Sequence, residues 1–313
     1  MLAYIARRLL STIPVMAMVA VVVFAILRLT PGDPAAIIAG DGATTEQLEQ
    51  MRVRMGLDKP VHTQFIVWAL QLVRGDLGVS LISGVPVASM IGDRIGPTVS
   101  LGLLIITFSV IVAVPLGTIA AWRQGTLIDR SVMAFSVLGF SVPVFVVGYL
   151  LILVFSLTFG WLPVQGYRPM ADGLWPYLQR LILPTLTLSM AYIALIARIT
   201  RTSILEVMGE DYIRTARSKG LQEQAVLTRH ALRNAAVPIV TIIGAGVAAL
   251  ISGVVVTESV FNLPGLGRLV VEAVLARDYP VIQGLILFFS FAYIMINLAV
   301  DVLYTVFDPR IRY

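Results

Sequence analysis

The chain of 313 residues has no cysteine and only two histidines. Disulfide bonds are therefore impossible, and metal sites built on thiolates are excluded. Charge is also scarce, because Asp, Glu, Lys and Arg make up 13% of the residues whereas hydrophobic residues make up 58%. Together with a mean hydropathy of +0.90, this composition excludes an ordinary soluble domain and places the chain in a lipid bilayer.

Most of the sequence consists of long runs of apolar residues. About 20 apolar residues are needed to cross a hydrocarbon core of about 30 Å. Runs of roughly that length occur six times, at residues 9–29, 99–122, 132–159, 181–199, 235–257 and 282–307. The sequence therefore predicts an all-α integral membrane protein with six transmembrane helices. The third run is long enough to tilt or break, and Pro143 in its middle is the predicted break, since proline interrupts the helical hydrogen bonds.

The basic residues concentrate on one set of loops, beginning with Arg7 and Arg8 before the first run. Because basic loops face the cytoplasm, both termini and residues 209–238 are predicted to be cytoplasmic. The net charge of +5 is then a sign of topology and gives no reason to expect a nucleic-acid partner. His62 and His230 fall on opposite sides of the membrane and cannot form one site. The first run is too long for a secretory signal and is expected to stay as a span.

A long outer segment, residues 31–97, is predicted between the first two spans, and its length favours structure of its own. Thr44 and Gln47 have the spacing of a capping box, which would open a helix that Gly56 ends. A second amphipathic stretch at residues 62–74 is too short to span and is expected on the outer membrane surface or against the spans. The predicted organisation is a first transmembrane helix in 1–30, the outer segment with amphipathic helices in 31–97, and a core of five transmembrane helices in 98–313 that includes a cytoplasmic loop at 203–234.

Motifs for energy conversion or catalysis are missing as well. The chain has no G-x-x-x-x-G-K-[ST] loop, whose backbone amides and lysine would hold nucleotide phosphates, and Gly244 and Gly246 lie inside an apolar run where helix packing explains them. An ion-coupled secondary transporter would need ionisable residues near the bilayer midplane, but Asp301 and Glu258 lie near the ends of their spans. No intramembrane histidine, Ser-Lys pair, paired aspartate or metal-ligand cluster indicates an enzyme. From the residues alone, a six-span transporter subunit remains.

One polar island, residues 209–238 with the sequence GEDYIRTARSKGLQEQAVLTRHALRNAAVP, interrupts the apolar runs. Acidic residues open its first segment and basic residues close it, which suits the helix macrodipole. Gly220 can adopt the left-handed conformation that ends a helix, and a second helix is predicted from Gln222 to about Arg233. The island is either a docking loop for a cytoplasmic partner or a solvated connector with ordinary topological charge.

Particular motifs carry a resemblance to a known family. The runs EDYIRTARSKGL and HALRNAAVP resemble the cytoplasmic coupling loop of bacterial ABC importer permeases, in the dipeptide, oligopeptide and nickel (also glutathione) subfamily. The general importer pattern has Glu-Ala-Ala where this chain has Arg214, Thr215 and Ala216, and Pro238 lies further from Gly220 than in that pattern; the peptide subfamily is similar in both departures. PGDP, GLDKP, GDLG, PGLGRL, RDYP and FDPRIRY extend the resemblance over the chain.

The resemblance implies the type I ABC importer permease fold and a place in the bacterial inner membrane. It also implies a homologous second permease as a heterodimer partner, two cytoplasmic ATPase subunits that hold ATP and Mg, and an extracytoplasmic substrate-binding protein. This chain would bind no cofactor and catalyse no reaction. Dipeptides or short peptides are the implied substrates. Glutathione, nickel chelates or another small solute in the same role, and an ion-coupled secondary transporter as a different class, are the alternatives.

Two sets of residues are predicted to act in transport. The ATPase-docking set, in which the small Ala216 and Gly220 lie one turn apart on one face after Tyr212, comprises Glu210, Asp211, Tyr212, Arg214, Thr215, Ala216, Lys219 and Gly220. The translocation path is predicted where hydroxyls and a broken helix could accommodate a polar substrate, at Ser141, Pro143, Thr187, Ser189 and Ser252.

Overall fold

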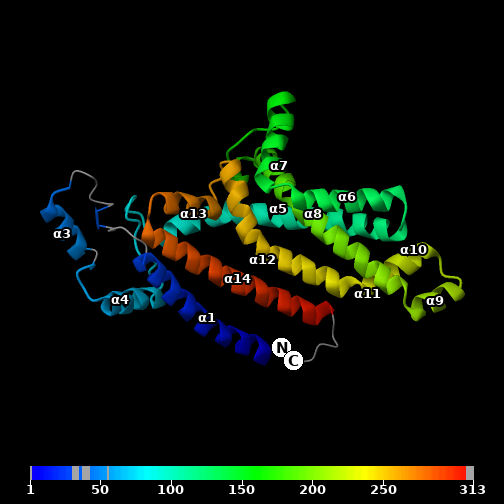
Figure 1. Ribbon diagram of the computed structural model, residues 1–313, viewed down its shortest axis with the longest axis horizontal. Helices are drawn as coiled ribbons and strands as arrows, with labels where there is room; N and C mark the ends of the chain where they lie inside the picture. Colours follow the sequence, from blue (N-terminus) through cyan, green and yellow to red (C-terminus); the bar gives the residue numbers. More distant parts are fainter. Residues whose placement is uncertain (1, 30–34, 37–42, 55, 308–313) are drawn as a thin grey trace. The chain divides into compact units, whose positions relative to one another are not determined.

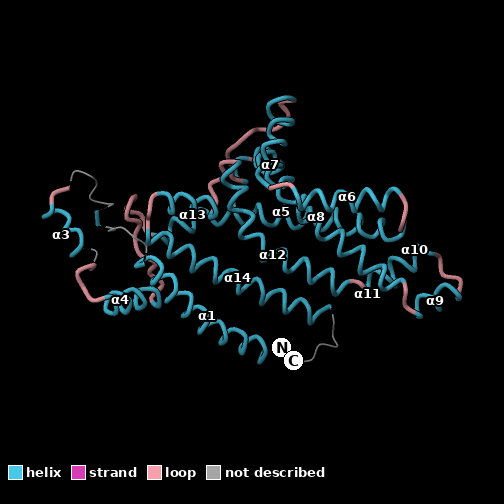
Figure 2. The backbone as a smooth tube through the Cα atoms, in the orientation of Figure 1, coloured by secondary structure: helices cyan, strands magenta, loops and turns pink. Residues whose placement is uncertain are grey.

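The computed structural model describes residues 2–29, 35–36, 43–54 and 56–307, and helices dominate this part of the chain (Figures 1 and 2). The motifs PGDP and FDPRIRY fall wholly or largely outside the described residues. The main helices are α1 (Leu2–Leu29), α3 (Thr45–Arg54), α4 (Val61–Val73), α5 (Val87–Trp122), α6 (Leu127–Ser141), α7 (Val144–Leu151), α8 (Leu174–Met208), α9 (Asp211–Ser218), α12 (Ala236–Val260), α13 (Leu266–Leu275) and α14 (Tyr279–Phe307).

Five of these helices, α1, α5, α8, α12 and α14, are long and apolar enough to cross a membrane. α6, followed after a short break by α7 and the π-helical segment Ile152–Thr158, is apolar enough to count as a sixth span if the two parts, bent by 105°, cross as one. The break lies at Pro143, as the sequence predicts. Val142 before it is extended, with φ −88° and ψ 125°, because a residue preceding proline is disfavoured in the helical region. The all-α membrane prediction is confirmed, with five spans or six if the bent pair is one span.

The backbone divides into two compact units. The first unit contains Met1–Gly96 and Arg268–Ile294, and the second contains Pro97–Gly267 and Met295–Tyr313. Helices α5, α13 and α14 each contribute residues to both. α5 begins at Val87, so the last residues of the expected outer segment are already helical.

In the second unit α8 is the central helix. It packs against α6, α7 and α12, and its buried side chains, among them Leu188, Tyr192 and Ile196, form the core of the unit. α5 also crosses it closely: a Cβ added to Gly117 would lie 2.5 Å from the carbonyl oxygen of Ala197. Because contact at this range leaves no room for a side chain, the glycine is what permits the crossing. α8 is therefore held from several sides.

A buried carboxylate anchors the far end of α12 in the same unit. The Glu258 side chain is fully buried, and the Thr98 hydroxyl donates to its Oε1 at 2.6 Å. The same hydroxyl accepts the backbone N–H of Leu266 at 2.8 Å. Thr98 therefore connects the start of α13 to α12 through one side chain.

The first unit holds most of the outer segment, and both of its predicted helices are present. Thr44 and Gln47 form the capping box, with the Thr44 N–H donating to Gln47 Oε1 at 2.9 Å and the Gln47 N–H donating to Thr44 Oγ1 at 3.3 Å. α4 corresponds to the amphipathic stretch, and its Phe65 and Trp68 rings contact Phe24 of α1 at centroid distances of 5.3 and 5.5 Å. The short helix thus packs on the first span, one of the two positions expected for it.

A second polar anchor in the first unit fixes the GDLG region. Asp278 is buried and accepts the Ser80 hydroxyl at 2.5 Å and the Leu81 N–H at 3.1 Å. The motif itself is a turn, in which the Gly78 N–H donates to Asp76 Oδ1 at 2.8 Å. Its Gly and Asp content is therefore turn chemistry, as expected.

Candidate functional site

The polar island begins where the central helix α8 ends. Two residues, Gly209 and Glu210, separate α8 from α9, and their N–H groups still bond to Glu206 and Val207 of α8 at 3.1 Å each. The chain therefore turns without a flexible linker. A movement of α9 would act directly on the end of α8.

The ends of α9 match the sequence prediction. Glu210 is the extended N-cap, Asp211 stands in the first turn and Arg217 in the last. The negative charge lies at the positive end of the helix dipole and the positive charge at its negative end, which stabilises the helix. Gly220 follows with φ +78°, and the space around its missing side chain is empty to 4 Å. The left-handed conformation alone explains why glycine suits this position within the chain.

One face of α9 is buried inside the loop. Ile213 and Ala216 pack with Val226, and Val207 and Met208 from the end of α8 cover the same cluster. Ala216 is only 7% exposed. This differs from the expectation that Ala216 presents a small surface to a partner. Residues three apart share a helix face, and the face shared with Ile213 is the one that packs inward.

The other face of α9 is exposed and charged. Exposed side chains that could contact a partner are those of Glu210, Asp211, Tyr212, Arg214, Thr215 and Lys219. Asp211 pairs with Arg214 at 3.3 Å, and both side chains are largely exposed, so this ion pair is weak. Partial burial, with a smaller contribution from the Glu210 charge, raises the pKa of Tyr212 above its ordinary value. The ring stays a neutral hydrogen-bond donor.

An ion pair joins α9 to the helix that follows. Arg217 donates from Nε and Nη2 to the two carboxylate oxygens of Glu223, at 2.6 and 3.2 Å. The hydrogen bond to Glu223 raises the pKa of Arg217. The second helix begins after Gln222, as predicted, and continues through Glu223–Ala225, a π-helical turn at Val226–Ala231 and Leu232–Asn234. The π turn was not foreseen from the sequence.

The predicted path residues fall into two groups. Ser141, Pro143 and Ser252 are exposed, and Ser141 and Pro143 lie at the break between α6 and α7. Thr187 and Ser189 are instead buried in α8, where their hydroxyls donate to the carbonyls of Leu183 at 2.7 Å and Ile105 at 3.4 Å. The structure does not gather the five on one surface. In this chain Thr187 and Ser189 satisfy their hydroxyls by bonding to helix backbone.

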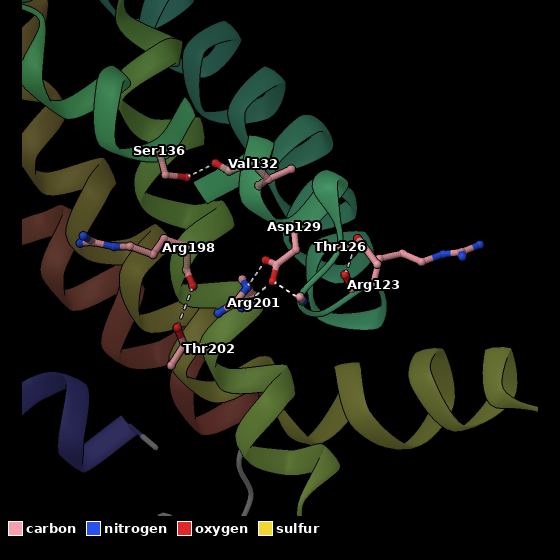
Figure 3. Close-up of polar contacts among 9 residues, drawn as sticks. Arg123, Thr126, Asp129, Val132, Ser136, Arg198, Arg201 and Thr202 are labelled. Carbon is pink, nitrogen blue, oxygen red and sulfur yellow. Dashed lines mark hydrogen bonds and ion pairs between the residues drawn. The ribbon is translucent and has the colours of Figure 1, made fainter. Parts of the chain in front are cut away.

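An ion pair near the polar island was missed by the sequence analysis (Figure 3). Asp129, in the first turn of α6, is 4% exposed. Arg201 of α8 donates to it from Nε at 2.5 Å and from Nη2 at 2.8 Å, and the Gly125 N–H donates to Oδ2 at 2.9 Å. A bidentate guanidinium and a backbone amide satisfy the carboxylate. The two partners are 72 residues apart in sequence, so no local pattern pairs them.

The fold and the site together define a class. The protein is a multi-span helical membrane protein whose central helix continues into an exposed polar helix. Within the described residues, no group of three or more His, Cys, Asp or Glu side chains could hold a metal ion.

Comparison with known protein families identifies the family to which the chain belongs. Residues 113–313 match the family described as "Binding-protein-dependent transport system inner membrane component", and residues 1–102 match the N-terminal family of the same membrane components. The chain belongs to this family of inner membrane transport components. It is therefore a multi-pass membrane protein.

Several relatives match over almost their whole length. The chain is 54% identical over 310 residues to the probable peptide ABC transporter permease protein y4tP of Sinorhizobium fredii, covering 99% of each chain. It is 47% identical over 313 residues to a putative peptide transport system permease protein of Brucella abortus, with full coverage of both. It is also 47% identical, over 313 residues and with full coverage, to the glutathione transport system permease protein GsiC of Escherichia coli.

A solved structure shows the same fold at lower similarity. It is titled as the crystal structure of an amino acid ABC transporter with histidines, and it is 18% identical to this chain with a TM-score of 0.51. The match covers 72% of this chain and 95% of the other. The all-α permease fold implied by the sequence is thereby confirmed.

Proposed function

We propose that this chain is a transmembrane permease subunit of an ATP-driven, binding-protein-dependent importer of short peptides. It would form a heterodimer with a homologous second permease. Two cytoplasmic ATPase subunits would hold ATP and Mg, and an extracytoplasmic binding protein would deliver the substrate. The chain itself would provide half of the translocation path and catalyse no reaction.

The observation that carries this proposal is the construction of α9. Its inner face is packed against Val226 and the end of α8, whereas its outer face leaves Tyr212, Arg214 and Lys219 exposed. A connector that only crossed the surface would not need a buried anchor. A helix that must transmit force from a partner to α8 does need one, because a loosely attached helix would move without moving the spans.

Peptides are the proposed substrates because two relatives that match the full chain carry peptide transport in their names. Glutathione, itself a tripeptide, is the second candidate, supported by the similarity to GsiC. Both solutes are polar and flexible, so each would need a path lined in part by polar groups. Ser141 and Ser252 are the exposed hydroxyls proposed to contribute to it.

In the proposed cycle, closure of the two ATPase subunits would displace α9 and with it the end of α8. The spans would then tilt so that the path opens to the outside, and release of the hydrolysis products would return them. This role requires that residues 209–238 and both termini face the cytoplasm, which the basic residues of those segments support. No residue of this chain is expected to contact the nucleotide.

Gly220→Leu tests the assignment of α9. A side chain in the left-handed region costs about 1–2 kcal/mol, and leucine would also project from the outer surface of the loop, where the chain leaves the space empty. The complex with its second permease, ATPase subunits and binding protein should therefore assemble in the membrane but lose most ATP-driven uptake. Radiolabelled dialanine, trialanine and glutathione serve as the uptake probes in proteoliposomes.

Gly220→Asn is the matched control, because asparagine tolerates the left-handed conformation better than other side chains. It should retain more uptake than Gly220→Leu. The isolated chain, without ATPase subunits, should show no ATP turnover. An assembled Gly220→Leu complex with unchanged uptake and unchanged ATP hydrolysis would show that α9 is only a connector. Uptake that depends on an ion gradient and not on ATP would favour the secondary-transporter alternative.

A further inference from the structure

The Asp129–Arg201 pair lies on the route from α9 to the broken span. Arg201 stands seven residues before the end of α8, or about 10 Å along its axis. The chain then reaches α9 through only Gly209 and Glu210, both still bonded to α8. The packing of Ile213 and Ala216 beneath Val207 and Met208 joins the two helices a second time. α9 and the end of α8 are therefore joined both through the backbone and through side-chain packing.

On the other side of the pair, α6 runs antiparallel to α8. Asp129 meets Arg201 at one end of α6, and near the other end Gly139 approaches Ala194 and Met190. A Cβ at Gly139 would lie 2.9 Å from the Ala194 Cβ, so the helices are in direct contact there. Two residues after Ser141, the last of α6, the chain reaches the break at Pro143. α6 is thus attached to α8 at both ends.

The Asp129–Arg201 pair is buried and held by several hydrogen bonds, unlike an ion pair on the surface. The carboxylate is almost fully buried and accepts three hydrogen bonds, two of them from one guanidinium. A bidentate contact fixes the relative orientation of its two partners as well as their distance. By contrast, the neighbouring Arg130 is exposed, although it stands on the same turn of α6. Only one of the two adjacent charges is used to join the helices.

We propose that Asp129 and Arg201 are positioning residues that make α6 move with α8, so that a displacement of α9 reaches the break at Pro143. This rests on the proposed coupling role of α9. Without the pair, α6 and α8 would keep their packing near Gly139 but lose the bond that fixes them together at the end nearer α9, and less of the movement produced by the ATPase subunits would reach the break. Asp129 lies in the first turn of α6 and Arg201 about two turns before the end of α8, so the link lies near the end of α8 that continues into α9.

The experiment measures coupling separately from assembly. Asp129→Asn, Arg201→Gln, the double variant and the control Arg130→Gln are reconstituted with the second permease, the ATPase subunits and the binding protein. The ratio of probe molecules taken up to ATP hydrolysed is measured with dialanine, trialanine and glutathione. Each single variant should assemble but lower the ratio at least about fivefold, the lower end of usual coupling between sites. The double variant should lower it no further, because both changes break one link.

A distance measurement tests the movement itself. Because the chain has no cysteine, cysteines placed at the exposed Ser218 of α9 and Ser141 of α6 carry two spin labels without further changes to this chain, and the partner subunits are used in cysteine-free form. In the parent complex their distance should stay the same when ATP and vanadate trap the ATPase subunits. In Asp129→Asn it should change on trapping, since α6 no longer follows α8. A purely structural role would alter the distance before trapping and leave it constant afterwards.

Three results would overturn the proposal: an unchanged uptake ratio in both assembled single variants, additive losses in the double variant, or a distance in Asp129→Asn that does not respond to trapping. Loss of assembly in parallel with uptake would also overturn it, because the pair would then serve stability alone. The proposed substrate class fails separately, if the parent complex takes up none of the three probes. The distance measurement still decides the role of the pair in that case, since it needs only ATP, vanadate and the ATPase subunits.

Discussion

Replacing Gly117 by alanine should destabilise the second unit although the change adds only one methyl group. Its Cβ would lie 2.5 Å from the Ala197 carbonyl oxygen and 2.7 Å from the Thr200 Cβ, whereas ordinary contact begins near 3.4 Å. One of these atoms belongs to the backbone, so no side chain can rotate away to relieve the overlap. α5 and α8 must move apart, and α8 is held on other sides by α6, α7 and α12.

The cost follows from overpacking, which usually amounts to about 1–3 kcal/mol. Gly102→Ala is the matched control because it lies on the same helix and nothing stands within 4 Å of its added Cβ. There the greater helix propensity of alanine, worth up to about 1 kcal/mol, is the only effect. The same substitution should therefore have opposite signs at the two positions.

Thermal unfolding of the purified chain in detergent measures this difference. The shift per kcal/mol falls with chain length and is about 2–4 °C at 150–250 residues, so in this longer chain Gly117→Ala should lower the midpoint by about 1 °C or more, and Gly102→Ala should leave it unchanged or raise it. Equal shifts at the two positions would refute the close crossing of α5 and α8.

Two further predictions concern topology and the buried Glu258. A cysteine at Ser218 should react with a membrane-impermeant maleimide only from the cytoplasmic side, and one at Ser83 only from outside, because the basic loops are cytoplasmic; labelling of Ser218→Cys in intact cells would reverse the orientation. Thr98→Val should cost about 1–3 kcal/mol in unfolding measurements, since it removes a donor from Glu258 and the acceptor of the Leu266 N–H. Thr98→Ser keeps the hydroxyl and should unfold close to the parent, and equal stability of the valine and serine variants would argue against the bridge.

Features that depend on a few neighbouring residues were predictable from the sequence. The break at Pro143 was indicated by the missing N–H of proline, although Pro115 and Pro184 lie inside the continuous helices α5 and α8. The capping box at Thr44 and Gln47 follows from a spacing of three. The end of α9 at Gly220 follows from the left-handed conformation that glycine permits. The capping box and the end of α9 are decided within one or two turns of chain, so no knowledge of the tertiary packing was needed for them.

Features that depend on packing between distant segments were not predictable. The pairing of Arg201 with Asp129 could not be foreseen, because the two residues lie 72 positions apart. The face of α9 that contains Ala216 was expected to be outward, since nothing local shows that Val226 returns to cover it. The π-helical turn at Val226–Ala231 shifts the backbone hydrogen bonds by one residue, and such turns occur in few helices. These are the features that connect the polar island to the spans.

The separation of Asp129 from Arg201 also has a consequence for biosynthesis. A ribosome adds about 5–20 residues per second, so Arg201 is made roughly 4–14 seconds after Asp129. Throughout that interval the newly inserted α6 carries a carboxylate at the membrane boundary with no guanidinium to meet it. The hydrogen bonds that join the start of α6 to α8 can therefore form only after synthesis has reached α8, which makes this contact a late step in the folding of the chain.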